Sequence, residues 1–113
     1  MEQISINYTE FGCRNIAAIK SFYSEAFGWT FTDYGAEYIA FNDGKNEGGF
    51  FVNAQFVAAG NPLVILYAAH LEEALHRVSH AGGVIVKEIF AFPGGRRFHF
   101  TDPDGNVLAV WGA

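Results

Sequence analysis

Two pairs of residues whose side chains could take part in binding or catalysis lie near opposite ends of the chain. Tyr8 and Glu10 are two residues apart, Arg97 and His99 are two residues apart, and Trp111 follows close to the C-terminus. Residues two apart share one face of a β-strand. A carboxylate and an imidazole can transfer protons, while an arginine and aromatic rings can hold a polar, partly aromatic small molecule. We take Glu10 and His99 as candidate catalytic residues and all five as candidate ligand-binding residues.

A structural alternative stands beside these roles. Glu10 could pair with Arg97 or His99 across strands, which is worth at most about 1 kcal/mol if the pair is exposed. A single histidine on a strand is usually a hydrogen-bonded structural residue. The loop from Phe92 to Arg97, with two glycines and two arginines, could hold an anion, although we favour a flexible loop with surface arginines.

Other polar residues favour structural interpretations. His76 and His80 have the spacing of a metal-chelating pair, but no third donor is evident, so a solvated helix face is favoured. Cys13 is the single cysteine, which excludes an intramolecular disulfide and indicates a small buried side chain on the face of Phe11. Asp102–Gly105 has Pro and Gly where a tight turn needs them.

Composition limits the classes of protein that fit. The chain has 113 residues, 50% hydrophobic and 17% charged, with a formal charge of −5, which predicts one well-packed domain. An acidic chain without a basic stripe is a poor nucleic-acid binder. The longest apolar run, Leu63–Ala69, is far shorter than the roughly 20 residues that cross a bilayer. Met1–Gln3 shows no feature of a signal peptide, so we expect no membrane partner and a cytoplasmic location.

Two segments are predicted to be amphipathic helices. Asn15–Phe27 has apolar residues at steps of three and four, with Asn15 as N-cap and Gly28 as the stop. His70–Ala81 repeats the pattern and ends at a Gly-Gly pair. The other segments are predicted to be strands: Ile4–Cys13, Trp29–Tyr34, Glu37–Phe41, Gly48–Asn53, Pro62–Ala68, Val84–Ile89, Arg96–Thr101 and Asn106–Gly112.

The predicted elements repeat in the two halves of the chain. A shift of 55 residues places Asn15 on His70 and Gly28 on Gly83. Because the element order also repeats, the chain is interpreted as a duplicated βαβββ module. We place module one at about 1–53, the linker at about 54–61 and module two at about 62–113, within a single domain over 1–113.

Several local motifs, in this order and spacing, are similar to one family. They are the segments Asn15–Tyr23, Phe27–Trp29, Ala81–Gly83 and Phe100–Asn106. Together with the tandem βαβββ order, they make the chain resemble the vicinal oxygen chelate superfamily, which includes glyoxalase I, bleomycin-resistance proteins and extradiol dioxygenases. The resemblance implies an α+β fold in which each module is an open, curved, mixed sheet with one helix on its outer face. It also implies that the two sheets face each other across a cavity.

The resemblance also bears on metal binding. Metal-dependent members place one ligand on the first and one on the last strand of each module, positions that fall here on Tyr8, Gly48, Leu63 and Ala109. Three of these side chains offer no donor atom, so we expect no metal and no cofactor, although a divalent metal stays possible.

Three functions are compatible with the sequence. The first is a metal-independent binder of a small organic molecule, like bleomycin-resistance proteins; the acidic charge and aromatic cavity favour a cationic, planar guest. The second is a lyase, isomerase or dioxygenase that uses Glu10 and His99, or a metal held by unidentified donors. The third is a catalytically silent dimerisation module.

We also expect a homodimer, in which the cavities expose the five candidate residues. Five phenylalanines exceed what two short helices can cover: Phe50, Phe51, Phe56, Phe90 and Phe92. Pairing of two chains would hide them, as specific interfaces bury on the order of 1,600 Å². Relatives also pair in this way and often build the cavity from both chains. The site itself depends on strand alternation, because a slip of one residue would turn every candidate side chain towards the helices.

Overall fold

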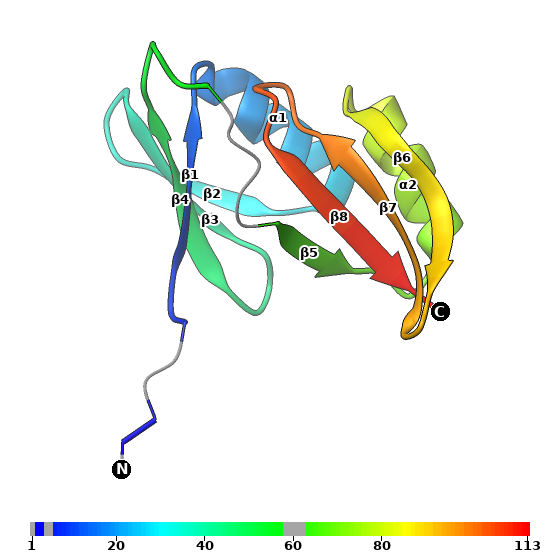
Figure 1. Cartoon of the computed structure of the whole chain (residues 1–113). Helices are drawn as coiled ribbons and strands as arrows, with labels where there is room; N and C mark the ends of the chain where they lie inside the picture. Colours follow the sequence, from blue (N-terminus) through cyan, green and yellow to red (C-terminus); the bar gives the residue numbers. More distant parts are fainter. Residues whose placement is uncertain (1, 4–5, 58–62) are drawn as a thin grey trace.

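The computed structural model describes residues 2–3, 6–57 and 63–113 as two βαβββ modules (Figure 1). Module one comprises β1 (Thr9–Cys13), α1 (Ile16–Phe27), β2 (Thr30–Asp33), β3 (Tyr38–Asn42) and β4 (Glu47–Val52). Module two comprises β5 (Val64–Tyr67), α2 (Leu71–His80), β6 (Val84–Phe92), β7 (Gly95–Thr101) and β8 (Val107–Gly112). Within the described residues, no helix is long and apolar enough to cross a membrane.

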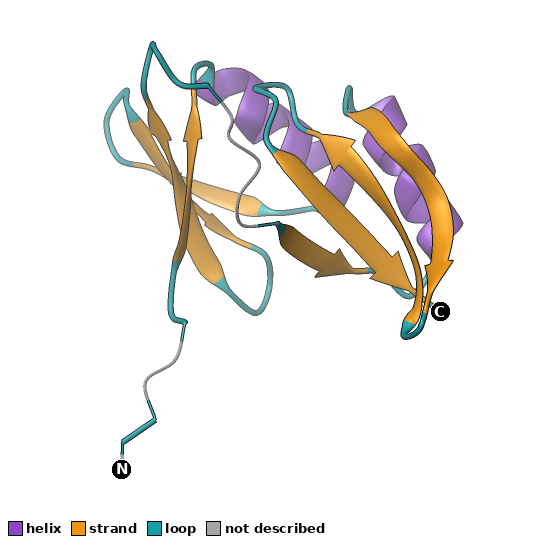
Figure 2. Ribbon diagram, in the orientation of Figure 1, coloured by secondary structure: helices purple, strands orange, loops and turns teal. Residues whose placement is uncertain are grey.

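Each module forms one four-stranded mixed sheet that does not close on itself (Figure 2). The strand order is β1-β4-β3-β2 in module one and β5-β8-β7-β6 in module two, so the two sheets repeat the same topology. In each, the first strand runs parallel to the last, and the other pairs are antiparallel. The predicted α+β fold with two βαβββ modules is therefore confirmed.

The helices begin and end within one residue of their predicted bounds. Asn15 caps α1 because its side-chain oxygen accepts a hydrogen bond from the amide of Ala18 at 3.1 Å. Gly28 ends this helix with a φ of 73°, a left-handed conformation that glycine adopts without strain. By contrast, His70 makes no side-chain cap bond at the start of α2, where Glu72 and Glu73 complement the helix dipole instead.

The core between α1 and its sheet is aromatic. Tyr23 packs between Trp29 and Phe50, with ring centroids 4.6 and 5.2 Å away. Phe50 is completely buried, so the prediction that it belongs to an exposed aromatic excess is wrong. The reason is its register: Phe50 lies opposite Phe11 and Ile39, on the face of the sheet that α1 covers.

Several strands differ in length from their predicted ranges. β6 extends to Phe92, three residues beyond the expected end, and its pairing with β7 has two register irregularities. β1 begins at Thr9 rather than Ile4, and β5 begins at Val64. Residues 4–5, half of the expected linker (58–61) and position 62 lie outside the described residues.

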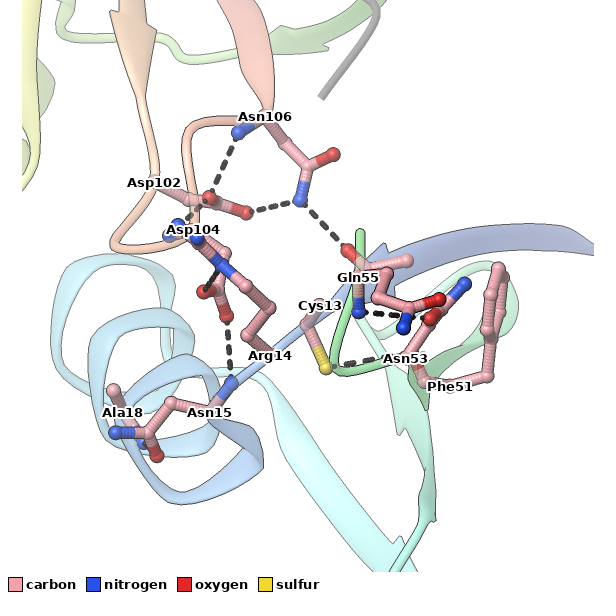
Figure 3. Close-up of polar contacts among 11 residues, drawn as sticks. Cys13, Arg14, Asn15, Ala18, Phe51, Asn53, Gln55, Asp102, Asp104 and Asn106 are labelled. Carbon is pink, nitrogen blue, oxygen red and sulfur yellow. Dashed lines mark hydrogen bonds and ion pairs between the residues drawn. The ribbon is translucent and has the colours of Figure 1, made fainter. Parts of the chain in front are cut away.

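A polar cluster at the β7–β8 hairpin joins the two modules (Figure 3). Asp104 Oδ2 accepts a hydrogen bond from the backbone amide of Asn15, at the start of α1, at 3.0 Å. The Asn106 side-chain amide donates to the carbonyl of Gly12 at 3.0 Å and to Asp102 Oδ2 at 2.9 Å. The hairpin of module two is thus tied to the end of β1 and the start of α1.

Cys13 lies beside this junction. Its side chain is fully buried, as predicted, and its thiol lies 3.6 Å from the carbonyl oxygen of Phe51. Burial, together with the negative charges of Asp104 and Asp102, raises the pKa of the thiol to about 11. A thiol with this pKa stays protonated at neutral pH, which fits a packing role rather than that of a nucleophile.

Candidate functional site

The first polar group lies on module one, on the side of the sheet away from α1. Glu10 occupies β1 at a position opposite Gly49, and the hydroxyl of Tyr38 on β3 donates a hydrogen bond to Glu10 Oε2 at 2.9 Å. The same hydroxyl lies 2.6 Å from that of Tyr8. Tyr8, Tyr38 and Glu10 therefore form a short hydrogen-bonded chain.

Tyr38 is the centre of this chain and was not a candidate from sequence. Desolvation, followed by its hydrogen bonds with Tyr8 and Glu10, raises the pKa of this phenol well above its usual range. The phenol therefore stays protonated and serves as a donor. Gly49 makes room for it, since a Cβ at that position would overlap the Tyr38 hydroxyl.

The second polar group lies on module two, on the side of the sheet away from α2. Phe98 and Phe100 are fully buried towards the helix, so Arg97 and His99 between them face the other way. Arg97 lies opposite Trp111 on β8 and opposite Phe90 on β6. The alternation that predicted this placement is confirmed.

A further cation stands in the neighbouring row of the same face. His99 lies opposite Lys87 on β6 and opposite Ala109 on β8. The Lys87 ammonium is 4.2 Å from the ring centroid of Phe90, and the His99 ring is 5.7 Å from it. Lys87 and Phe90 therefore belong to this cluster, although neither was a candidate from sequence.

Aromatic rings surround the Arg97 guanidinium. Its central carbon lies 5.3 Å from the ring centroids of both Phe90 and Phe92. Phe92 in turn lies 6.4 Å from Trp111, which contacts Tyr67 at 5.0 Å. We call the cations and rings of this face the module-two cluster; its members are Tyr67, Lys87, Phe90, Phe92, Arg97, His99 and Trp111.

Two nitrogen atoms of this cluster have no hydrogen-bond partner within the described part of the chain. They are Arg97 Nε and His99 Nε2, and both are shielded from solvent. Burial lowers the pKa of His99 below 6.5, and the positive charges of Arg97 and Lys87 lower it further. The imidazole is therefore neutral at pH 7.

Arg96 and Arg97 are adjacent but have opposite environments. Arg96 faces α2, where its guanidinium forms two hydrogen bonds with Glu72, of 2.6 and 3.1 Å. It also donates to the carbonyl oxygen of Ala113. Arg97 has no acidic partner in the described residues, where the ion pairs are Arg14–Asp104, Lys20–Asp33 and Arg96–Glu72. The segment predicted as a flexible loop with two surface arginines is thus a hairpin in which Arg96 faces α2 and Arg97 lies on the helix-free side of the sheet.

The structure brings the five predicted residues together as two sets. Tyr8 and Glu10 are joined through Tyr38, while Arg97, His99 and Trp111 share the module-two face. No hydrogen bond, ion pair or ring contact links the two sets within residues 2–3, 6–57 and 63–113. Glu10 accepts from Tyr38 rather than pairing with Arg97 or His99.

A groove of about 790 Å³ lies between the modules, and none of the five candidates lines it. Its walls come from β1, the end of α1 with the segment after it, β5, α2 and the β3–β4 turn, and include Phe11, Trp29, Leu66 and Arg77. A cavity shared by all five residues therefore stays a prediction.

The positions that hold metal in some relatives do not suit a metal here. The Tyr8 hydroxyl is hydrogen bonded to Tyr38, and Leu63 and Ala109 have no donor atom. Gly48 faces α1, because a Cβ there would meet the ring of Phe41. In the described residues, no three His, Cys, Asp or Glu side chains are grouped to hold a metal ion. His76 and His80 lie exposed on α2.

Comparisons with known proteins agree with this architecture. The chain is similar to a glyoxalase-related enzyme from Fulvimarina pelagi, with a TM-score of 0.80 at 19% identity over 96% of this chain and 88% of that one. A glyoxalase family protein from Enterococcus faecalis gives 0.80 at 22% identity over 95% and 96%. Fosfomycin resistance protein FosX from Mesorhizobium loti gives 0.79 at 13% identity over 100% and 94%.

At these identities, the solved structures support the fold alone. A search of curated proteins by sequence finds no significant match. The match to a family model is decisive, since it spans residues 5–110, nearly the whole chain. The chain belongs to the Glyoxalase/Bleomycin resistance protein/Dioxygenase superfamily.

Proposed function

We propose that this protein binds a small organic molecule between the helix-free faces of its sheets, without a metal and as a homodimer. The observation that carries this proposal is the character of those faces. They leave large apolar side chains exposed, Tyr8 and Phe51 on module one and Ile65, Tyr67 and Val84 on module two, and module two also holds the Nε of Arg97 and Nε2 of His99, buried and unpartnered within the described residues. Exposed apolar groups around unsatisfied polar ones mark a surface that something else covers.

The dimer completes the site in this proposal. Within one chain, the Tyr8–Tyr38–Glu10 chain and the module-two cluster make no direct contact in the described residues. A second copy that presents its module one to this module two would put both sets around one ligand. Two-fold pairing gives two identical cavities and covers the exposed rings in both chains at once.

A ligand screen by thermal shift tests this proposal, run with and without divalent metals. A ligand at 100 times its Kd stabilises the folded state by about 2.7 kcal/mol, which is an easily measured shift. We expect a stabilising small molecule whose effect is the same with or without metal. Sedimentation measured in parallel should give the mass of two chains. A monomer mass at micromolar concentration, or stabilisation only with metal, would contradict the proposal.

His99 favours a second candidate function, a proton-transfer enzyme such as a lyase or isomerase. Its lowered pKa leaves a neutral imidazole at pH 7, which can accept a proton. Glu10, hydrogen bonded to Tyr38, would be the second acid–base group of the dimeric site. Once a ligand is known, the wild type should convert it and His99→Gln should bind it without conversion. A ligand that returns unchanged from the wild type would leave binding as the function.

A further inference from the structure

We propose that the module-two cluster recognises a carboxylate, so that the ligand is a small anion with a flat apolar body. This inference deepens and rests on the proposed function. It reverses the expectation from composition, because the net charge of −5 favoured a cationic guest. The charge on the module-two face has the opposite sign to the net charge of the chain.

The local charge on this face is positive. Lys87 and Arg97 occupy adjacent rows of the sheet, with His99 directly opposite Lys87. Neither cation belongs to an ion pair of the described residues, whereas Arg96, one position away, is paired with Glu72. Because the chain is acidic overall and still provides no acidic partner for these two cations in the described residues, we infer that a carboxylate of the ligand pairs with them.

The donor geometry suits a carboxylate. Arg97 Nε has no hydrogen-bond partner in the described residues, and a guanidinium can donate from two nitrogens to the two oxygens of a carboxylate in a bidentate pair. In the tautomer that carries its proton on Nε2, neutral His99 donates one further hydrogen bond to the same anion. Leaving these atoms unpaired in a shielded place costs free energy, and an anion removes that cost.

The aromatic rings would hold the guanidinium and the body of the ligand. Phe90 and Phe92 both lie 5.3 Å from the Arg97 guanidinium carbon, which restricts its movement. Tyr67 is 63% exposed beside Trp111, so a flat ring can stack there while its carboxylate reaches Arg97.

Titration with three simple probes tests the proposal on the full chain. Benzoate has both charge and ring, acetate has the charge alone, and benzylamine has the ring with the opposite charge. The readouts are the NMR signals of the Trp111 indole and the His99 ring. We expect benzoate to shift both signals, acetate to bind about tenfold more weakly, and benzylamine to leave both unchanged.

Adjacent arginines provide a matched pair of variants. Arg97→Met should weaken benzoate binding by about 10- to 100-fold, as expected for a charge-assisted hydrogen-bonded pair. Arg96→Met removes the same charge from the opposite face and should change binding less than about twofold. An Arg97→Met variant that binds benzoate like the wild type would overturn the proposal, and its NMR spectrum shows whether it is folded.

The results also separate this proposal from the proposed function. If benzylamine shifts the Trp111 and His99 signals and benzoate does not, the face binds ligands but the carboxylate assignment is wrong. If no probe shifts either signal, the carboxylate assignment is again overturned, and the ligand screen decides the proposed function by itself. If no ligand in that screen stabilises the protein, the proposed function fails as well.

Discussion

Two polar clusters of this protein differ in whether their buried polar atoms have hydrogen-bond partners. At the module junction, Asp102 is 4% exposed, and its oxygens accept hydrogen bonds from the Tyr23 hydroxyl and from backbone and side-chain groups of Asn106. On the helix-free face of module two, Arg97 Nε and His99 Nε2 are shielded without any partner in the described residues. A cluster whose buried polar atoms all have hydrogen-bond partners has a structural role. A cluster whose buried polar atoms lack partners indicates that a partner comes from outside the chain.

Desolvation acts on both clusters but produces opposite shifts. Burial raises the pKa of Asp102, although the hydrogen bonds from Asn106, Asp104 and Tyr23 oppose it. Burial lowers the pKa of His99, and the cations Arg97 and Lys87 act in the same direction. At the junction, hydrogen bonds from neighbouring groups stabilise the buried carboxylate. In the module-two cluster, positively charged side chains lie close to one another. That difference is the basis of the predictions below.

The largest expected effect is the loss of the junction carboxylate. Asp102→Leu should lower the free energy of unfolding by about 3 kcal/mol, because it leaves the Tyr23 hydroxyl and the backbone amide of Asn106 without their acceptor. Urea unfolding followed by circular dichroism measures it. Asp33→Leu is the control, since Asp33 forms an exposed ion pair with Lys20 and should lose no more than about 1 kcal/mol. Equal losses in the two variants would show that the junction does not hold the modules together.

Local signals in the sequence predicted much of the fold. The apolar periodicity together with Asn15 and Gly28 located α1, and the alternation along the chain placed Glu10 and Arg97 on the helix-free faces. These signals are local, since caps and strand alternation depend on residues a few positions apart.

The rest of the site depended on long-range register. Lys87 and Phe90 are three residues apart, so alternation puts them on opposite faces, but an irregularity between them in β6 turns both towards His99 and Arg97. Glu10 and Tyr38 lie on β1 and β3, on either side of β4, so their contact depends on the strand order of the folded sheet. The junction between Asp104 and Asn15 spans 89 positions, which no local pattern encodes.

A smaller effect is expected from a single hydroxyl at the junction. Tyr23→Phe removes the donor to Asp102 Oδ2 and keeps the ring that stacks on Trp29, so the free energy of unfolding should fall by about 1 kcal/mol. The variant should leave benzoate binding unchanged, since Tyr23 lies under the sheet of module one. A Tyr34→Phe control, at an exposed tyrosine, should leave stability unchanged. Altered benzoate binding in Tyr23→Phe would show that the two clusters are coupled.

The pH dependence of stability distinguishes the clusters further. The pKa of His99 is lower in the folded protein than its ordinary 6.5, so the unfolded chain binds more protons as pH falls. Its contribution to stability is present above pH 6.5 and is lost as pH falls from 6.5 through the folded pKa. The charged residues that face it are Lys87 and Arg97, whereas its neighbour on β8 is Ala109.

Urea unfolding between pH 8 and pH 5 measures this contribution. The wild type should lose more stability on acidification than His99→Gln, whereas His76→Gln, on the exposed face of α2, should follow the wild type. The raised pKa of Asp102 acts with the opposite sign: its contribution is present below 3.8 and is lost as pH rises through the folded pKa. A His99→Gln variant with the same acid dependence as the wild type would contradict the burial of this imidazole.

The smallest expected effect on stability comes from replacing Arg97. Arg97→Met removes a shielded cation that has no acidic partner in the described residues and keeps an apolar stem against Phe90 and Phe92. The lost contact with the rings and the relieved repulsion of Lys87 and His99 oppose each other, so the free energy of unfolding should change by less than about 0.5 kcal/mol. The same variant should raise the pKa of His99 in an NMR titration, because one of its neighbouring charges is gone. A loss as large as that of Asp102→Leu would make Arg97 a structural residue like Asp102, and the module-two cluster would then need no ligand to explain it.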